Sequence, residues 1–116
     1  MIGLDSFLDK PGVLAAGQFS AEGEMVRGVG KLDKEQMEHV AEICKRAANT
    51  LGSLTGELET ATGMPWNELS GWVLMGGNLA LCVTSDAGVI VDSRRADFNQ
   101  ILVDLFGPPA GGVPVP

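Results

Sequence analysis

The sequence predicts an α+β domain: a three-layer α/β/α arrangement with a five-stranded antiparallel sheet and the element order α-β-β-α-β-β-β-α. A heptad pattern over residues 33–62 predicts one long central helix. Three apolar runs between residues 69 and 91 are separated by short breaks rich in Gly, Asn and Asp, which favour antiparallel hairpins. Because these runs do not alternate between apolar and polar residues, we expect helices to cover both faces of the sheet.

The N-terminal third predicts a short helix followed by a hairpin. Leu4, Phe7 and Leu8 share one helical face within the first ten residues, and Pro11 with Gly12 ends that helix. Residues 13–19 and 24–29 form two strand-like runs around a four-residue break that ends in Gly. We therefore expect a helix and two paired strands before the long helix begins.

The long helix has clear start and stop signals. Asp33 and Gln36 form a capping-box pattern, and Gly63 with Pro65 supplies the stop. Thirty residues span about 45 Å, whereas a compact chain of this length has a radius of gyration of about 13 Å. The helix must overhang the body or bend, and its seam either packs on the sheet or faces a second subunit. The apolar positions of the seam are Met37, Val40, Cys44, Ala47, Leu51, Leu54, Leu58 and Ala61.

The C-terminal part predicts three strands and a final helix. The strands cover residues 69–75, 79–84 and 89–91, and an apolar stripe predicts a helix over about 94–106, capped by Asp92 or Ser93. Arg94 and Arg95 would lie in its first turn, where they could pair with Asp92 or Asp97 or contact an acidic partner. We expect one domain over residues 1–107 and a flexible, Pro- and Gly-rich tail over 108–116.

Charge and composition exclude several function classes. The 116 residues are 45% hydrophobic, enough for one core, and their net charge of -7 disfavours nucleic acid and anionic membrane surfaces as partners. The sequence shows neither a secretory signal nor a spanning segment, and it contains only two cysteines. A cytoplasmic protein with reduced thiols is the expectation.

No pattern of residues predicts a catalytic, cofactor-binding or metal site. His39 is the only histidine and does not share a helical face with Cys44, five residues later. Cys44 and Cys82 both lie in apolar surroundings, which favours a role as small hydrophobes, or as a redox pair if the fold brings them into contact. Residues 28–31 lack the first Gly and the final Ser or Thr of a phosphate-binding loop.

Several short motifs occur in this order of elements: Pro11-Gly12-Val13-Leu14-Ala15-Ala16-Gly17, Glu22-Gly23, Pro65-Trp66, Gly71-Trp72 and Ala96-Asp97-Phe98-Asn99. With these motifs the chain resembles the roadblock/dynein-light-chain superfamily, which has a profilin-like fold. The resemblance covers residues 2–106 and looks closest to a bacterial branch of short, single-domain proteins of unknown function.

The resemblance implies a homodimer. Two sheets would join edge to edge through their third strands, with Trp72 and Leu74 near that contact. The long helices would pack together near Leu51, Leu54 and Leu58. It also implies a non-enzymatic adaptor for a protein partner, plausibly a small GTPase or other NTPase, although no partner-binding residue carries over.

Two alternatives stay open at this point. Small residues could leave a ligand cavity over the sheet, which would make the chain a small-molecule sensor; these residues are Ala15, Ala16, Gly17, Ala80 and Gly88. Alternatively, the chain could be a thiol-dependent accessory protein that works through Cys44 or Cys82. The resemblance gives the context, since some members of the bacterial branch are associated with sulfur-oxidising or other energy metabolism.

Overall fold

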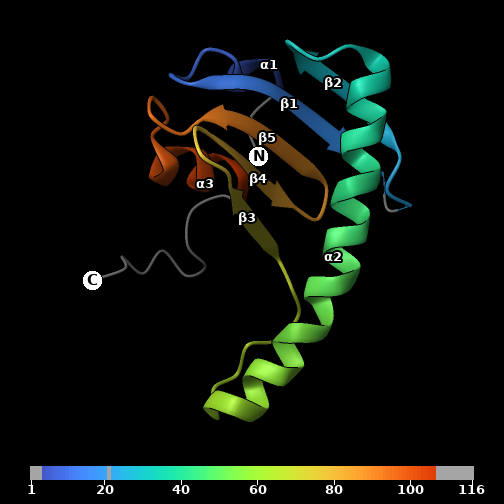
Figure 1. The fold of residues 1–116 in the computed structure, drawn as a ribbon, viewed down its shortest axis with the longest axis vertical. Helices are drawn as coiled ribbons and strands as arrows, with labels where there is room; N and C mark the ends of the chain where they lie inside the picture. Colours follow the sequence, from blue (N-terminus) through green and yellow to red (C-terminus); the bar gives the residue numbers. More distant parts are fainter. Residues whose placement is uncertain (1–3, 21, 107–116) are drawn as a thin grey trace.

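The predicted order of elements is confirmed in a computed structural model, which describes residues 4–20 and 22–106 (Figure 1). The predicted tail over 108–116 lies outside the described residues. The elements are α1 (Leu4–Phe7), β1 (Val13–Phe19), β2 (Met25–Gly30), α2 (Lys34–Thr62), β3 (Gly71–Met75), β4 (Leu79–Thr84), β5 (Ala87–Asp92) and α3 (Phe98–Phe106).

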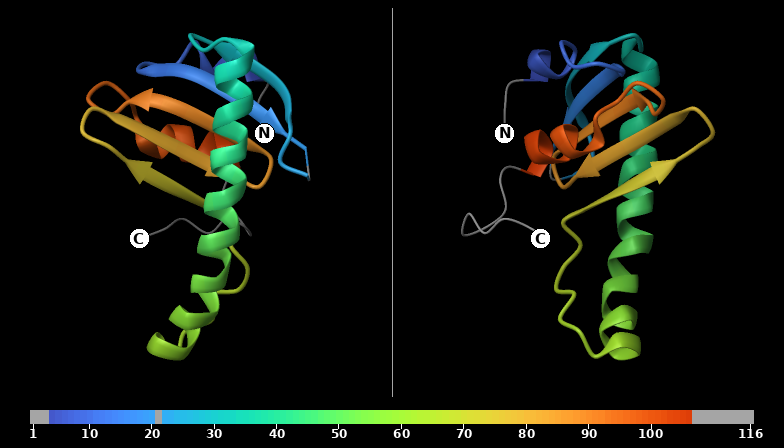
Figure 2. Two further views of the ribbon diagram at one scale, coloured as in Figure 1. Left: turned by 45° about the vertical axis from the view of Figure 1, so that its right-hand side comes forward. Right: turned by 90° about the vertical axis from the view of Figure 1, so that its left-hand side faces the viewer.

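The five strands form one antiparallel sheet in the order β2-β1-β5-β4-β3. The first hairpin therefore joins the last strand through the β1–β5 pair, and β2 and β3 become the two outer edges. Helix α2 lies on one face of the sheet, and α1 and α3 lie on the other (Figure 2). The prediction of three layers is thus confirmed.

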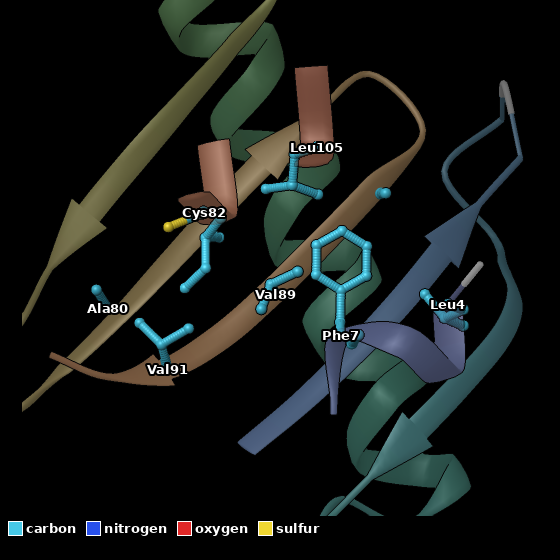
Figure 3. Close-up of a cluster of buried hydrophobic side chains, with 10 residues drawn as sticks. Leu4, Phe7, Ala80, Cys82, Val89, Val91 and Leu105 are labelled. Atoms are coloured by element: carbon cyan, nitrogen blue, oxygen red, sulfur yellow. The ribbon is translucent and has the colours of Figure 1, made fainter. Parts of the chain in front are cut away.

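The larger core lies between the sheet and the α1/α3 layer. Phe7 is fully buried there, together with Cys82 and Val91 (Figure 3). Alternate residues of a strand point to opposite faces, so Val83 points instead toward α2. On that side the buried residues of α2 are Met37, Ala41 and Cys44, all from its first half.

Both ends of α2 form as the sequence predicts. The Gln36 N–H donates to Asp33 Oδ1 at 2.8 Å, and the Asp33 N–H donates to Gln36 Oε1 at 2.9 Å. At the other end, Gly63 takes φ 69°, and its N–H donates to the Glu59 carbonyl at 2.9 Å. The helix runs without a break for 29 residues and overhangs the body, and its axis curves along its second half (Figure 1).

The last helix begins four residues later than predicted. The Asp92 carboxylate accepts from the Arg94 N–H at 3.0 Å, which fixes a turn where we expected the first helical residues. Asp97 caps α3 instead, since its Oδ1 accepts from the Gln100 N–H at 3.2 Å. Arg94 thus lies outside the helix and pairs with Asp92, one of the two partners expected for it.

The expected apolar face of the first helix is also partly wrong. Leu4 and Phe7 are buried, but Leu8 is 38% exposed. Helix α1 ends at Phe7, and the next N–H groups make turn bonds, as that of Leu8 does to the Asp5 carbonyl at 3.2 Å. The turn rotates Leu8 away from the sheet.

Lys10 and Asp104 tie the α1 turn to α3. The Lys10 ammonium pairs with Asp104 Oδ2, and the side-chain amide of Gln100 donates to Asp104 Oδ1 at 3.1 Å. The hydrogen bond from Lys10 holds the pKa of Asp104 below its ordinary 3.8, with a smaller contribution from Gln100. The ionised form is therefore favoured in the folded protein.

We predict that Asp104→Asn lowers the free energy of unfolding at neutral pH. A lowered carboxyl pKa stabilises the fold above the ordinary value of 3.8, and this stabilisation is lost as the pH falls through the lowered pKa. The gap between the wild type and the variant should therefore shrink as the pH falls below 4, as measured by urea unfolding at several pH values. Asp9→Asn is the control for the loss of one negative charge, because Asp9 is exposed and forms no ion pair among the described residues. A gap for Asp104→Asn that stays constant with pH would contradict the ion pair.

Candidate functional site: an uncovered helix and sheet edge

The second half of α2 extends beyond the sheet (Figures 1 and 2). We call residues 52–62 the overhang; at 1.5 Å per residue it is about 16 Å long. A Cβ added at Gly52 or Gly56 would meet no described atom within 4 Å beyond its chain neighbours and the adjacent backbone of the helix, and Leu54 and Leu58 are 40% and 37% exposed. The overhang therefore carries apolar side chains that the described chain leaves uncovered.

A strap, residues 63–70, leads from the end of the overhang back to β3. The indole N–H of Trp66 donates to Thr62 Oγ1 at 3.1 Å, and the Asn67 N–H donates to Glu59 Oε1 at 2.7 Å. These bonds fix the strap against the last turns of α2, and Asn67 takes φ 59° in the left-handed region to make its bond. Met64 and Trp66 nevertheless remain 61% and 46% exposed.

Strand β3 forms the sheet edge nearest the overhang. In the described part of the chain it pairs only with β4, with Trp72 opposite Val83 and Leu74 opposite Leu81. Trp72 and Leu74 therefore point to the same face as α2, and Val73 points to the other. Leu74 is 61% exposed, and Trp72 is half-buried.

All five residues predicted for an interface lie on the α2 side of the molecule. Leu51, Leu54 and Leu58 follow one another at spacings of three and four, so they form one flank of α2. Leu51 is half-buried, and the other two are exposed. The fold thus brings the leucine flank close to the two β3 side chains on the α2 face, Trp72 and Leu74, on one surface of the molecule.

Two further exposed side chains on this surface escaped the sequence prediction. Ile43 is 39% exposed and lies three turns, eleven residues, before Leu54 on the same flank. Leu79 is 51% exposed and points to the α2 face, because it is two residues from Leu81 in β4. Ile43 lies one position outside the heptad seam, so the heptad spacing did not identify it. The face to which Leu79 points depends on the strand register, which the sequence does not give.

The two thiols lie apart, on opposite faces of the sheet. Cys82 belongs to the core beneath α1 and α3, and Cys44 projects from α2 on the other side. Both are free and buried, and burial raises the pKa of Cys44 to about 11 and that of Cys82 above its ordinary value. The fold therefore does not place them in contact as a redox pair.

The space over the small residues of the sheet is too small for a metabolite. The recess lined by Ala15, Ala16, Gly17 and Gly88 holds about 10 Å³, roughly one water molecule. Ala80, also expected to line a cavity, faces the opposite core. Within residues 4–20 and 22–106, no cluster of His, Cys, Asp and Glu could hold a metal ion, and no helix is long and apolar enough to cross a membrane.

The arrangement of these elements defines the roadblock fold, and solved structures agree. The chain is similar to a Roadblock/LC7 domain from Streptomyces avermitilis, with a TM-score of 0.65 and 18% identity over 86% of this chain and 82% of that one. It is similar to the gliding protein MglB from Thermus thermophilus, with a TM-score of 0.67 and 17% identity over 86% and 75%. Myxococcus xanthus MglB gives 0.59 and 16% over 85% and 77%.

Within that fold, the chain belongs to the family described as "Uncharacterized conserved protein (DUF2173)", whose model matches residues 3–106. No curated protein matches the chain. The fold expected from the resemblance to the roadblock superfamily is thus confirmed.

We predict that both thiols are inert in the native protein. At pH 8 a thiol of pKa about 11 is about 0.1% thiolate, and Cys44 is 3% exposed, so a disulfide reagent should label it only as fast as the chain opens. Both cysteines should react at once in guanidinium chloride. Rapid reaction of either thiol in the native protein would contradict this prediction and would support a thiol-dependent function.

We predict that Gly56→Ala raises the free energy of unfolding by about 1 kcal/mol, the usual gain for Gly to Ala in a helix. The added Cβ meets no described atom, and Gly56 lies on the side of α2 away from the leucine flank. Gly71→Ala is the matched control and should destabilise, because its Cβ would collide with the Phe106 ring and the Val83 carbonyl. Thermal unfolding measures both. A loss of stability in Gly56→Ala would mean that this side of the helix is covered.

Proposed function

We propose that the protein is a non-enzymatic homodimeric adaptor. Two copies join through their β3 edges and their overhangs, and the joined sheet and helices form a platform for a protein partner. The observation that carries the proposal is the uncovered apolar surface formed by the overhang and β3. The proposal places the protein in the cytoplasm, where its two free thiols stay reduced.

The length of the overhang fits a second sheet. Strands in a sheet lie about 4.8 Å apart, so an overhang of about 16 Å reaches over roughly three strands beyond β3. A second copy that continues the sheet from β3 would place its own β3, β4 and β5 in that space. By two-fold symmetry, its overhang would cover the first copy in return.

The exposed side chains fit the same arrangement. Leu74 and Leu79 are 61% and 51% exposed on the α2 face, where their own helix leaves them uncovered. The overhang of a second copy would lie over this part of the sheet and would bring Leu54 and Leu58 with it. Apolar burial of this kind is the main driving force of association.

Strand β3 lacks the features that usually protect a sheet edge. Its sequence Gly71-Trp72-Val73-Leu74-Met75 contains neither a charged residue nor Pro. An exposed apolar edge of this kind readily pairs with another strand. Antiparallel pairing with the β3 of a second copy would satisfy its free backbone groups and would produce one continuous sheet.

The adaptor role and an NTPase partner rest on the resemblance to the roadblock superfamily, whose members typically act as adaptors for small GTPases and other NTPases. The purified protein is accordingly expected to release no phosphate from GTP or ATP. Nucleotide hydrolysis that follows the protein through purification would contradict the non-enzymatic role.

We predict that Leu54→Glu/Leu58→Glu converts a dimer to a monomer. Light scattering of the wild type should give twice the 12.1 kDa of one chain, and the mass should hold on dilution through the micromolar range. The variant should give the mass of one chain, because four glutamates would enter the contact between the helices.

Val26→Glu provides a control, because Val26 is 63% exposed on the opposite edge strand, β2. This variant should keep the mass of the wild type. A wild type that is monomeric at these concentrations would overturn the dimer and weaken the adaptor role. A Leu54→Glu/Leu58→Glu variant that stays dimeric would place the contact elsewhere.

A further inference from the structure

We propose that the β2 edge, at the opposite end of the sheet from β3, binds an extended, basic segment of a partner protein as an added strand. The site is formed by the outer side of β2 and by an acidic groove beside its first residues. It does not depend on the proposed dimer, in which both β2 strands would remain at the outer ends of the joined sheet.

The outer side of β2 offers backbone groups. The Lys31 N–H donates to the Leu14 carbonyl of β1 at 3.0 Å. Val29 and Arg27 lie two and four residues before Lys31, so they also direct their backbone groups toward β1. Antiparallel strands bond through alternate residues, so Gly28 directs its N–H and C=O away from β1. Gly28 is exposed, which leaves these groups open to a further strand.

A register shift leaves one residue of β2 unpaired at the start of the strand. Gln18 pairs with Arg27 and Phe19 pairs with Met25, so the pairing skips Val26. Val26 is 63% exposed and offers an apolar contact beside the free backbone. A partner segment could therefore combine backbone pairing at Gly28 with a side-chain contact at Val26.

An acidic groove beside the start of β2 favours a positively charged partner segment. It has a volume of about 310 Å³ between the start of β2 and α2, and Glu24, Glu38 and Glu42 line it together with Gly23 and Met25. Among the described residues, Glu24 and Glu42 form no ion pair, and Glu38 has only the exposed Lys34 at 3.9 Å.

The basic side chain of the edge strand itself is directed elsewhere. The Arg27 guanidinium donates to Asp5 of α1 at 2.7 Å, and so it is held on the opposite face of the sheet from the groove. Lys or Arg side chains of an added strand could therefore reach the three carboxylates without competition from Arg27.

A second copy of this chain fits the edge poorly. Each copy carries a net charge of -7, and pairing β2 with β2 would bring two sets of groove carboxylates to one junction. Like charges brought together in this way oppose association. A basic partner segment gains from the same carboxylates, and its attraction would weaken with added salt.

The test measures binding of a fluorescein-labelled short peptide of alternating Arg and Val to the full chain, by fluorescence anisotropy. Glu24→Gln/Glu42→Gln should weaken binding about tenfold, because two exposed charge pairs with the peptide are lost. Glu57→Gln/Glu68→Gln removes the same charge from the overhang and strap and should change binding less than about twofold. Equal weakening by both pairs would mean attraction by net charge alone and would overturn the site.

A second peptide tests the strand pairing. The same sequence with every backbone nitrogen methylated keeps its charge but has no N–H groups to donate, so it should bind at least about tenfold more weakly. Hydrogen exchange at the Gly28 amide should slow when the unmodified peptide binds. Equal binding of both peptides, an unchanged exchange rate, or no binding of the unmodified peptide would each overturn the proposal; none of these results bears on the mass of the dimer.

Discussion

The structure depends on a helix that is longer than the sheet it crosses. Helix α2 has 29 residues and extends for about 43 Å, whereas five strands span roughly 20 Å from edge to edge. Its first half supplies every buried residue of that helix, from Met37 to Cys44. The remaining turns project past β3, and the strap of residues 63–70 is bonded to them by Trp66 and Asn67. The uncovered surface is thus a direct consequence of helix length.

The two edges of the sheet differ in chemistry, and this difference separates their proposed roles. Strand β3 is short, uncharged and apolar, with Leu74 61% exposed, which suits pairing with an identical strand. Strand β2 has a register shift at Val26 and a groove of carboxylates beside it, which suits a basic segment from a different protein. The face of the sheet opposite α2 is fully covered, because α1 and α3 bury Phe7 and Ile101 against it.

Local signals predicted most of the fold. The capping box at Asp33, the heptad spacing and the Gly63 stop fixed α2 at both ends, because these interactions lie within a few residues of each other. The start of α3 was missed because the Asp92 side chain forms a turn with Arg94, a competition that apolar periodicity does not reveal. For the candidate site, the residue spacing was enough to identify the leucine flank. The exposure of Ile43 and Leu79 on the same surface could be recognised only from the packing of α2 and the register of β4.

The central claim is that a second copy covers the β3 edge and the overhang, and hydrogen exchange at the β3 amides tests it most directly. A covered edge slows exchange at every β3 amide, including those that point away from β4. The account predicts such protection in the wild type at concentrations where it is dimeric, and its loss in Leu54→Glu/Leu58→Glu. Fast exchange at the outward amides of the dimeric wild type would show that β3 is an open edge, and would contradict the account.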